Sequence, residues 1–192
     1  MNNLPPIEEP QAHDGFLRAL WRTWVSACFH PNKFFETVGN SQNLTTALLF
    51  GFGCWVIVGL LSPFVIFLTE LPDTSFQKEF GLFLFPLSLV GCVVQFALTL
   101  LYGLILHLFL LFFGGARQGL SITLRVVAYA QAPIIFFFCG SGIWTLLLYI
   151  VGLAAAHRTD TWRSVLAVLV SFIPCCFGGA LWLALLEAGK LG

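Results

Sequence analysis

Apolar and polar positions divide the chain into one amphipathic segment followed by long hydrophobic runs. Over residues 15–30 the apolar side chains recur at helical spacing and form one stripe, whereas polar residues such as Arg18 and Arg22 fall elsewhere. Pro31 ends this segment or begins a short further turn. The pattern predicts an amphipathic helix region over residues 15–40.

The runs that follow are typical of helices that cross a lipid bilayer. Residues 44–69 and 82–113 contain no charged side chain, and at about 1.5 Å per residue each is long enough for a hydrocarbon core of about 30 Å. Pro86 predicts a helix start or a kink in the second run, with the residues before it lying at the membrane surface. One tilted helix is the alternative.

The remaining apolar sequence predicts a helical hairpin and a last span. The residues CGSG at 139–142 supply a turn, which separates predicted helices over 122–138 and 143–157. Pro133 predicts a kink in the first of these helices, and the last span is predicted over 164–186. The expected fold is an all-α membrane bundle of five transmembrane helices, preceded by the amphipathic interfacial helix.

The first 14 residues differ from the rest of the chain. They contain three prolines and three acidic residues but few apolar ones, which favours a disordered tail. The expected organisation is therefore a tail over 1–14, an amphipathic interfacial region over 15–40, and a five-helix membrane domain over 41–192.

Composition supports the membrane assignment and excludes an ordinary soluble domain. Hydrophobic residues make up 58% of the chain, charged residues 9%, and the mean hydropathy is +0.91; soluble domains carry about 25% charged residues. The formal net charge is zero, so no overall field attracts nucleic acid, and none is expected as a partner.

The placement of positive charges predicts the orientation. If the N-terminus is cytoplasmic, five spans place seven Lys and Arg residues inside and two outside, as the positive-inside rule requires. The inside residues are Arg18, Arg22, Lys33, Arg117, Arg125, Arg158 and Arg163, and the outside ones are Lys78 and Lys190. The chain is therefore expected to have its N-terminus in the cytoplasm and its C-terminus outside.

Basic and aromatic side chains before the first span predict contact with the membrane surface. A basic amphipathic helix with tryptophans beside a hydrophobic run commonly lies in the lipid interface. The residues expected there are Arg18, Trp21, Arg22, Trp24, Phe34 and Phe35. The alternative is a helix that packs onto the protein's own cytoplasmic loops.

Sequence patterns of catalysis or metal binding are missing. The six cysteines have no metal-ligand spacing, and no catalytic or phosphate-binding motif occurs. No acidic residue lies between Glu79 and Asp160. Neither catalytic nor metal residues nor a cofactor are therefore expected, and an intramembrane enzyme would need a site built from His107, Arg125, Tyr129 and His157.

Polar residues inside the predicted spans are the remaining candidates for function. Gln95, Thr99 and Tyr102 share one helical face, and His107 lies further along the same span. This face could line a path for a small solute. The alternative, which we favour, is hydrogen bonding between helices.

The next span begins with a second polar face. Arg125, Tyr129 and Pro133 follow at intervals of four residues and so share one face. Arg125 could reach lipid phosphates or bond loop carbonyls around His157 and Arg158. A structural contact between the two loops is the favoured interpretation.

These residues also carry a resemblance. The stretch FFGGARQGLSITLRVVAYAQAP, the following GSG and the Trp-led helix ending at His resemble the Yip1 domain family, especially its bacterial branch. The residues that match the family pattern are Gly114, Gly115, Thr123, Arg125, Tyr129, Ala130, Pro133, Gly140, Trp144, His157 and Arg163, with Trp21, Trp24, Pro31, Phe34 and Phe35 upstream. The resemblance covers residues 16–186. A proline before the glycine turn and the Asp–Leu–Tyr–Gly–Pro element of eukaryotic members are absent.

The resemblance implies five spans with a cytoplasmic N-terminus, here in a bacterial cytoplasmic (inner) membrane. Eukaryotic relatives bind Rab GTPases and act in membrane traffic and shaping, but the missing element speaks against a GTPase partner. The expected function is a non-enzymatic membrane-organising or interaction protein. Its partners would be the lipid bilayer and another protein or a second copy. A small-solute transporter or channel is the alternative.

Overall fold

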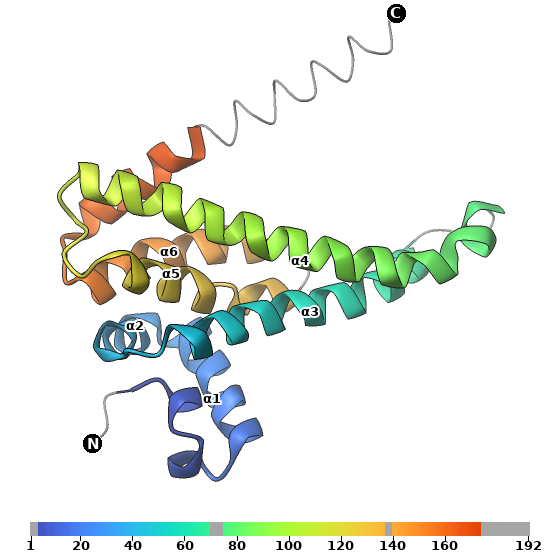
Figure 1. Ribbon diagram of the computed structural model, residues 1–192, viewed down its shortest axis with the longest axis horizontal. Helices are drawn as coiled ribbons and strands as arrows, with labels where there is room; N and C mark the ends of the chain where they lie inside the picture. Colours follow the sequence, from blue (N-terminus) through green and yellow to red (C-terminus); the bar gives the residue numbers. More distant parts are fainter. Residues whose placement is uncertain (1–3, 70–74, 137–139, 174–192) are drawn as a thin grey trace, which may run out of the picture.

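The computed structural model describes residues 4–69, 75–136 and 140–173 (Figure 1). Within these ranges the chain is helical and has no strand. The elements are the 3-10 helices η1 (Pro6–Glu8), η2 (Pro10–His13) and η3 (Ala132–Phe136), the α-helices α1 (Phe16–Phe29), α2 (Pro31–Asn40), α3 (Leu44–Thr69), α4 (Ser75–Phe112), α5 (Leu120–Tyr129) and α6 (Gly140–His157), and a last helix over Thr161–Ile173.

Three of these helices are long and apolar enough to cross a membrane. They are α3 over Leu44–Pro63, α4 over Phe85–Phe112, and α6. The α5–η3 unit (Leu120–Phe136) and the Thr161–Ile173 helix are shorter apolar segments. The all-helical membrane fold is thus confirmed, whereas the count of five spans stays a prediction, because the predicted last span continues beyond residue 173 and outside the described residues.

The hydrophobic runs form the predicted helices, with three differences in where the helices begin and end. α4 is one continuous helix of 38 residues that includes Pro86, so no separate surface piece precedes it. A proline in a helix removes one backbone hydrogen bond, which a long apolar helix tolerates. α6 begins at Gly140, inside the predicted turn. The helix predicted over 122–138 is shorter than expected, because α5 ends at Tyr129 and the 3-10 turn η3 follows, so Pro133 lies beyond the end of the α-helix and not at a kink within it.

The helices form a bundle from which the α3–α4 pair extends (Figure 1). α5, α6 and the Thr161–Ile173 helix lie alongside one half of this pair, and α2 packs against α6. α1 projects from the side of the bundle, across the direction of α3 and α4. The buried core lies where α2, α3, α5 and α6 meet, around Phe35, Val126, Tyr129 and Leu153.

Close approach of helices explains several glycines in this core. A Cβ atom at Gly51 of α3 would lie 2.9 Å from the carbonyl oxygen of Ala128 in α5, and one at Gly39 of α2 would lie 2.8 Å from that of Ala156 in α6. A side chain at Gly152 would meet Phe35 and Val126. Small residues let helix backbones approach closely, which is the usual way in which membrane helices associate.

The N-terminal segment, residues 4–14, differs from the predicted disordered tail. It carries η1 and η2, which pack on α1. Ile7 is buried, and its backbone N–H donates to Thr23 Oγ1 at 2.9 Å. Its prolines fix φ and so restrict the unfolded chain, which lowers the entropy lost on folding. The composition of the segment does not show that Ile7 packs into the nearby core.

The amphipathic stripe of α1 and α2 is divided between protein and surface. Phe34 and Phe35 of α2 are buried in the core, so neither is available to lipid. On α1, Trp24 packs against the core, whereas Trp21 is 60% exposed. Periodicity identifies the apolar stripe but does not tell a lipid surface from a groove between helices.

Candidate functional site

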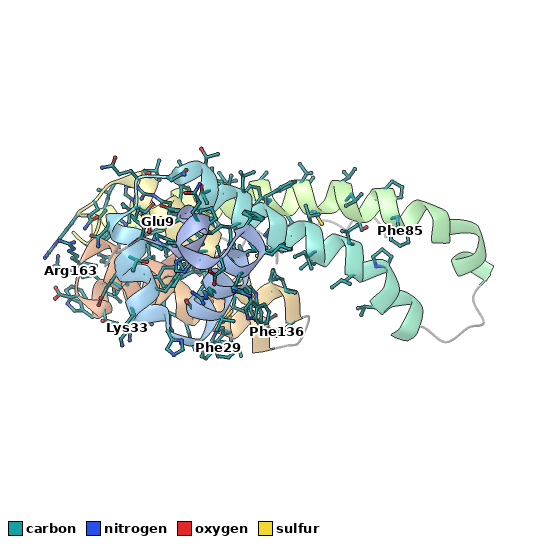
Figure 2. The ribbon with its side chains drawn as sticks, turned by 90° about the horizontal axis from the view of Figure 1, so that it is seen from below. Glu9, Phe29, Lys33, Phe85, Phe136 and Arg163 are labelled. Carbon is teal, nitrogen blue, oxygen red and sulfur yellow. The ribbon has the colours of Figure 1, made fainter. Side chains whose placement is uncertain are left out.

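Three arginines join the loops at one end of the bundle, which we call the arginine end. Arg117 donates to the carbonyl of Arg158 at 3.1 Å, and Arg163 donates to that of Gly114 at 2.7 Å. Arg158 donates to Asn40 Oδ1 at 2.9 Å, which adds the end of α2. Figure 2 places Arg163 at this end and Phe85 far along the α3–α4 pair.

Arg125 does not make the contact that its position suggested. Its guanidinium donates to the carbonyls of Val38 and Ser41, at the end of α2, and to the carbonyl and hydroxyl of Ser121. It is Arg117, and not Arg125, whose guanidinium donates to the carbonyl of Arg158 in the loop after α6. Carbonyls at a helix C-terminus lack intrahelical partners and carry partial negative charge, so a buried guanidinium satisfies them well.

Beside Arg125 lies a carboxylate that arrives from the N-terminal segment. The Ser41 hydroxyl donates to Glu8, with its Oγ 2.7 Å from both carboxylate oxygens, and the Tyr129 hydroxyl donates to Glu8 Oε1 at 3.3 Å. Arg125, Ser41 and Tyr129 are at most 5% exposed. We call Arg125, Ser41 and Tyr129 the carboxylate site, since together they supply a positive charge and two hydroxyl donors.

The electrostatics of Glu8 are a balance of opposed effects. Burial raises the pKa of the Glu8 carboxyl above its ordinary value, and the hydrogen bonds from Ser41 and Tyr129 and the charge of Arg125 offset part of that rise. Glu9 raises this pKa slightly further. The N-terminal segment is held mainly by the burial of Ile7, worth about 1.5–3 kcal/mol, and by a few hydrogen bonds, each worth about 0.5–1.5 kcal/mol.

Docking of the N-terminal segment should therefore depend on pH. Because the pKa of Glu8 is higher when docked than when free, docking is most favourable below the free value and weakens as the pH rises through the docked value. Hydrogen-exchange protection factors of residues 6–13 should be higher near pH 4 than near pH 7. Glu8→Gln should abolish this dependence, and an unchanged dependence in that variant would contradict the assignment to Glu8.

A second buried polar group links α4, α5 and α6. Thr123 Oγ1 lies 2.8 Å from His107 Nδ1 and 2.9 Å from His157 Nε2. The backbone N–H of Gln118 donates to His157 Nδ1 at 3.3 Å. Nδ1 of His157 is thus an acceptor, so Nε2 carries the proton and donates to Thr123, whose own hydroxyl proton goes to His107.

His107 and His157 take part in hydrogen bonds that connect helices. His107, Thr123 and His157 are each at most 8% exposed, and every bond joins one helix to another or to the loop before α5. Among the residues that the structure describes, no acidic side chain bonds to either ring. The arrangement is a structural connection between three helices, which favours the interhelical interpretation over catalysis.

A cavity of about 500 Å³ lies between α3, α4, η3, α6 and the Thr161–Ile173 helix. Its polar lining includes the three residues of the predicted seam, Gln95, Thr99 and Tyr102, so their shared face is confirmed. Opposite them, Gln131 donates to the hydroxyl of Tyr149 at 2.7 Å. The other lining residues are Trp55, Leu98, Ile134, Ser141, Gly142, Thr145, Leu146 and Phe172.

The cavity gives the transport alternative no support. None of the described residues that line it is charged, and His107, on which that alternative relied, is not among them. Tyr102 lies 2.8 Å from the Ser171 hydroxyl, so it also joins two helices. Of the three seam residues, Tyr102 thus bonds to another helix, whereas the Thr99 hydroxyl donates to the carbonyl of Gln95 on its own helix.

The exposed part of α1 forms a distinct surface. Leu17, Trp21 and Phe29 are 78%, 60% and 60% exposed, and we call these three the α1 apolar face. Trp21 stacks on Trp24, whose indole N–H donates to the carbonyl of Ala132 at 2.8 Å. Phe29 and Phe136 lie along the same edge of the molecule (Figure 2). Trp24 therefore anchors α1 while Trp21 stays outside.

Positive charge flanks the α1 apolar face. Arg18 pairs with Asp14 at 2.7 Å, and Arg22 lies 3.0 Å from His13 Nδ1. The Arg18 side chain is 61% exposed and that of Asp14 68%, so this pair contributes little to stability. Both arginine residues are exposed.

Residues that would hold a metal are not grouped in the described ranges. No set of three His, Cys, Asp or Glu side chains comes together there. Cys28, Cys54 and Cys92 are free and buried, and burial raises the pKa of the Cys28 thiol to about 12, so it is not a reactive thiolate. Cys139, Cys175 and Cys176 lie outside the described residues.

Sequence reasoning missed Glu8 and Ser41, and it named Thr123 only as a residue that matches the family pattern. Glu8 lies in the segment that was predicted to be disordered, and Ser41 and Thr123 look like ordinary polar residues at helix ends. Two glutamates among prolines gave no sign of a buried partner. An acid within reach of Arg125 could have been sought, since a buried arginine in a membrane protein requires one or more acceptors. Pro133, by contrast, was a candidate from the sequence, and it is buried in η3.

Comparison with protein families matches the Yip1 domain over residues 25–183, which is most of the chain. Comparisons with curated proteins and with solved structures find no match.

Proposed function

Since this chain belongs to the Yip1 domain family and is an integral membrane protein, we propose that it is a non-enzymatic protein that organises the membrane around it. The observation that carries this proposal is the α1 apolar face, which is exposed beside Arg18 and Arg22 on a helix lying across the bundle. Such a helix inserts its apolar side chains between lipid headgroups and its cations contact anionic lipids.

The orientation belongs to the same proposal. The arginine end, with Arg117, Arg158 and Arg163, would face the cytoplasm, as the positive-inside rule favours. The N-terminus would then be cytoplasmic and, with five spans, the C-terminus outside, in a bacterial cytoplasmic membrane. Reaction with a membrane-impermeant reagent at a cysteine introduced at residue 12 would test this orientation.

A role without catalysis fits the polar groups that are described. His107 and His157 bond to Thr123, and Arg125 bonds to helix-end carbonyls, so each acts between helices. A titratable group poised for proton transfer would instead need access to a substrate. The exposed apolar surface suits lipid and, beyond it, a second protein or a second copy of this chain.

The proposal predicts an effect of charge on the α1 apolar face. In full-length protein reconstituted into liposomes, Leu17→Glu combined with Trp21→Glu should abolish any change in vesicle diameter that the wild type causes. Burying each of these side chains in lipid is worth about 1.5–3 kcal/mol. Replacing both should therefore lower the equilibrium constant for insertion of α1 by more than about tenfold. Cryo-electron microscopy of the vesicles measures the diameters.

The matched control is Trp21→Phe, which keeps an apolar ring at the same position. This variant should shape vesicles as the wild type does. Equal vesicle diameters for the wild type, the charged variant and protein-free liposomes would contradict the proposal. Normal shaping by the charged variant would contradict the role of α1.

A further inference from the structure

The carboxylate site holds a group that the chain supplies from its own N-terminal segment. Ser41 Oγ lies 2.7 Å from both oxygens of Glu8, and the Tyr129 hydroxyl lies 3.3 Å from one of them. Arg125 adds a guanidinium that is 5% exposed. A cation with two hydroxyl donors is a binding site for any oxyanion, carboxylate or phosphate.

The neighbouring contact of the segment is apolar. Ile7 is 7% exposed and joins the buried core, with its backbone N–H bonded to Thr23. An apolar group beside a fixed oxyanion is the chemistry of an anionic lipid, whose chains adjoin its phosphate. The pair Ile7–Glu8 therefore occupies its site as such a molecule would.

The connection between the N-terminal segment and α1 would allow the segment to leave this site. It is a pair of single 3-10 turns, connected to α1 through Asp14 at φ 58° and Gly15 at φ +110°. A Cβ placed at Gly15 has no neighbour within 4 Å, so no packing contact holds this joint. It is held by the hydrogen bond from the Gly15 N–H to the Pro10 carbonyl and by the exposed pair of Asp14 and Arg18. Rotation at two residues in the left-handed region would move residues 4–13 without unfolding α1.

The depth of the site fits a headgroup. Arg125 bonds the carbonyl of Ser41, three residues before α3 begins at Leu44, and that of Ser121, in the first turn of α5. It thus lies where two apolar helices begin, on the side of the arginine end. Arginine at this level commonly reaches lipid phosphates.

We propose that Arg125, Ser41 and Tyr129 form a binding site for the phosphate of an anionic lipid, and that Glu8 occupies this site from within the same chain until the lipid displaces it. The lipid then competes with the N-terminal segment, so membrane composition sets how much of the segment is released. This inference does not depend on insertion of α1, whose apolar face is formed by other residues.

The test compares full-length protein in nanodiscs of phosphatidylcholine alone and in nanodiscs with added phosphatidic acid. Hydrogen exchange of the backbone amides of residues 6–13 reports docking of the segment. Phosphatidic acid should lower the protection of these amides about tenfold, which corresponds to one lost charge-assisted contact. Unchanged protection would overturn the proposal, and so would equal release by inorganic phosphate alone, which would make the site one for free anions.

Variants separate the site from general membrane charge. Glu8→Ala should bind phosphatidic acid more tightly, because the internal competitor has lost the carboxyl group that Ser41 and Tyr129 bind, whereas Glu9→Ala, at the neighbouring acid, should change the affinity less. Arg125→Gln should lose the response to phosphatidic acid. If Arg125→Gln does not fold, Ser41→Ala combined with Tyr129→Phe takes its place. A full response in the site variant, or the same affinity in Glu8→Ala and Glu9→Ala, would overturn the proposal.

Discussion

Gly51→Val is expected to destabilise the protein by roughly 3 kcal/mol, at the upper end of the usual cost of overpacking. Any Cβ at residue 51 lies 2.9 Å from the carbonyl oxygen of Ala128 and 3.1 Å from its Cα. The opposing atoms belong to a helix backbone and cannot rotate away, so α3 and α5 must separate. The free energy of unfolding, measured by titration with a denaturing detergent, checks this result.

Gly53→Val is the matched control on the same helix. A Cβ at residue 53 has no neighbour within 4 Å, while the cost of placing valine in a helix is shared by both variants. The difference between the two variants therefore isolates the contact between α3 and α5. Equal unfolding free energies would mean that Gly51 and Ala128 do not approach as described.

The second large effect is expected at Thr123, the middle of the histidine chain. Thr123→Val keeps the shape but leaves Nδ1 of His107 and Nε2 of His157 without the partner they share. Leaving a buried polar atom unsatisfied costs about 1–3 kcal/mol, so we expect a loss of about 2 kcal/mol or more in the same titration.

Thr99→Val provides the comparison for this prediction. Thr99 is also buried, at 8% exposure, but its hydroxyl donates only to the carbonyl of Gln95 one turn earlier on its own helix. Removing that bond should change stability by less than about 0.6 kcal/mol, the average for a hydrogen bond between membrane helices. A loss at Thr123 no larger than that at Thr99 would contradict a connecting role for the hydroxyl.

The helices could be predicted from the sequence because membrane spans leave a simple signal. α3 begins at Leu44 and ends at Thr69, as the charge-free run predicts. An irregularity near Pro133 also follows from the chemistry of proline, although α5 ends before Pro133 and does not kink there. The face shared by Gln95, Thr99 and Tyr102 follows from helical geometry and appears on the cavity wall. These features depend on residues close together in the chain.

The partners of polar residues could not be predicted, because they come from distant parts of the chain. Glu8 and Tyr129 are 121 residues apart, and Arg125 and Ser41 are 84 apart. Apolar periodicity likewise predicted the stripe on α1 and α2. It did not predict which residues of that stripe pack inside the protein, such as Phe35, and which remain exposed, such as Trp21. Only the packing of α2 against α6 decides which apolar residues remain for the membrane.

Insertion of the α1 apolar face into lipid is tested most directly by the accessibility of a spin label at residue 17 in nanodiscs. The account predicts that this label is reached readily by oxygen, which dissolves in lipid, and poorly by a water-soluble nickel complex. A label at residue 12, exposed on η2, should show the opposite preference. If the label at residue 17 is as accessible to the nickel complex as the one at residue 12, α1 does not enter the membrane, and the proposed function is wrong.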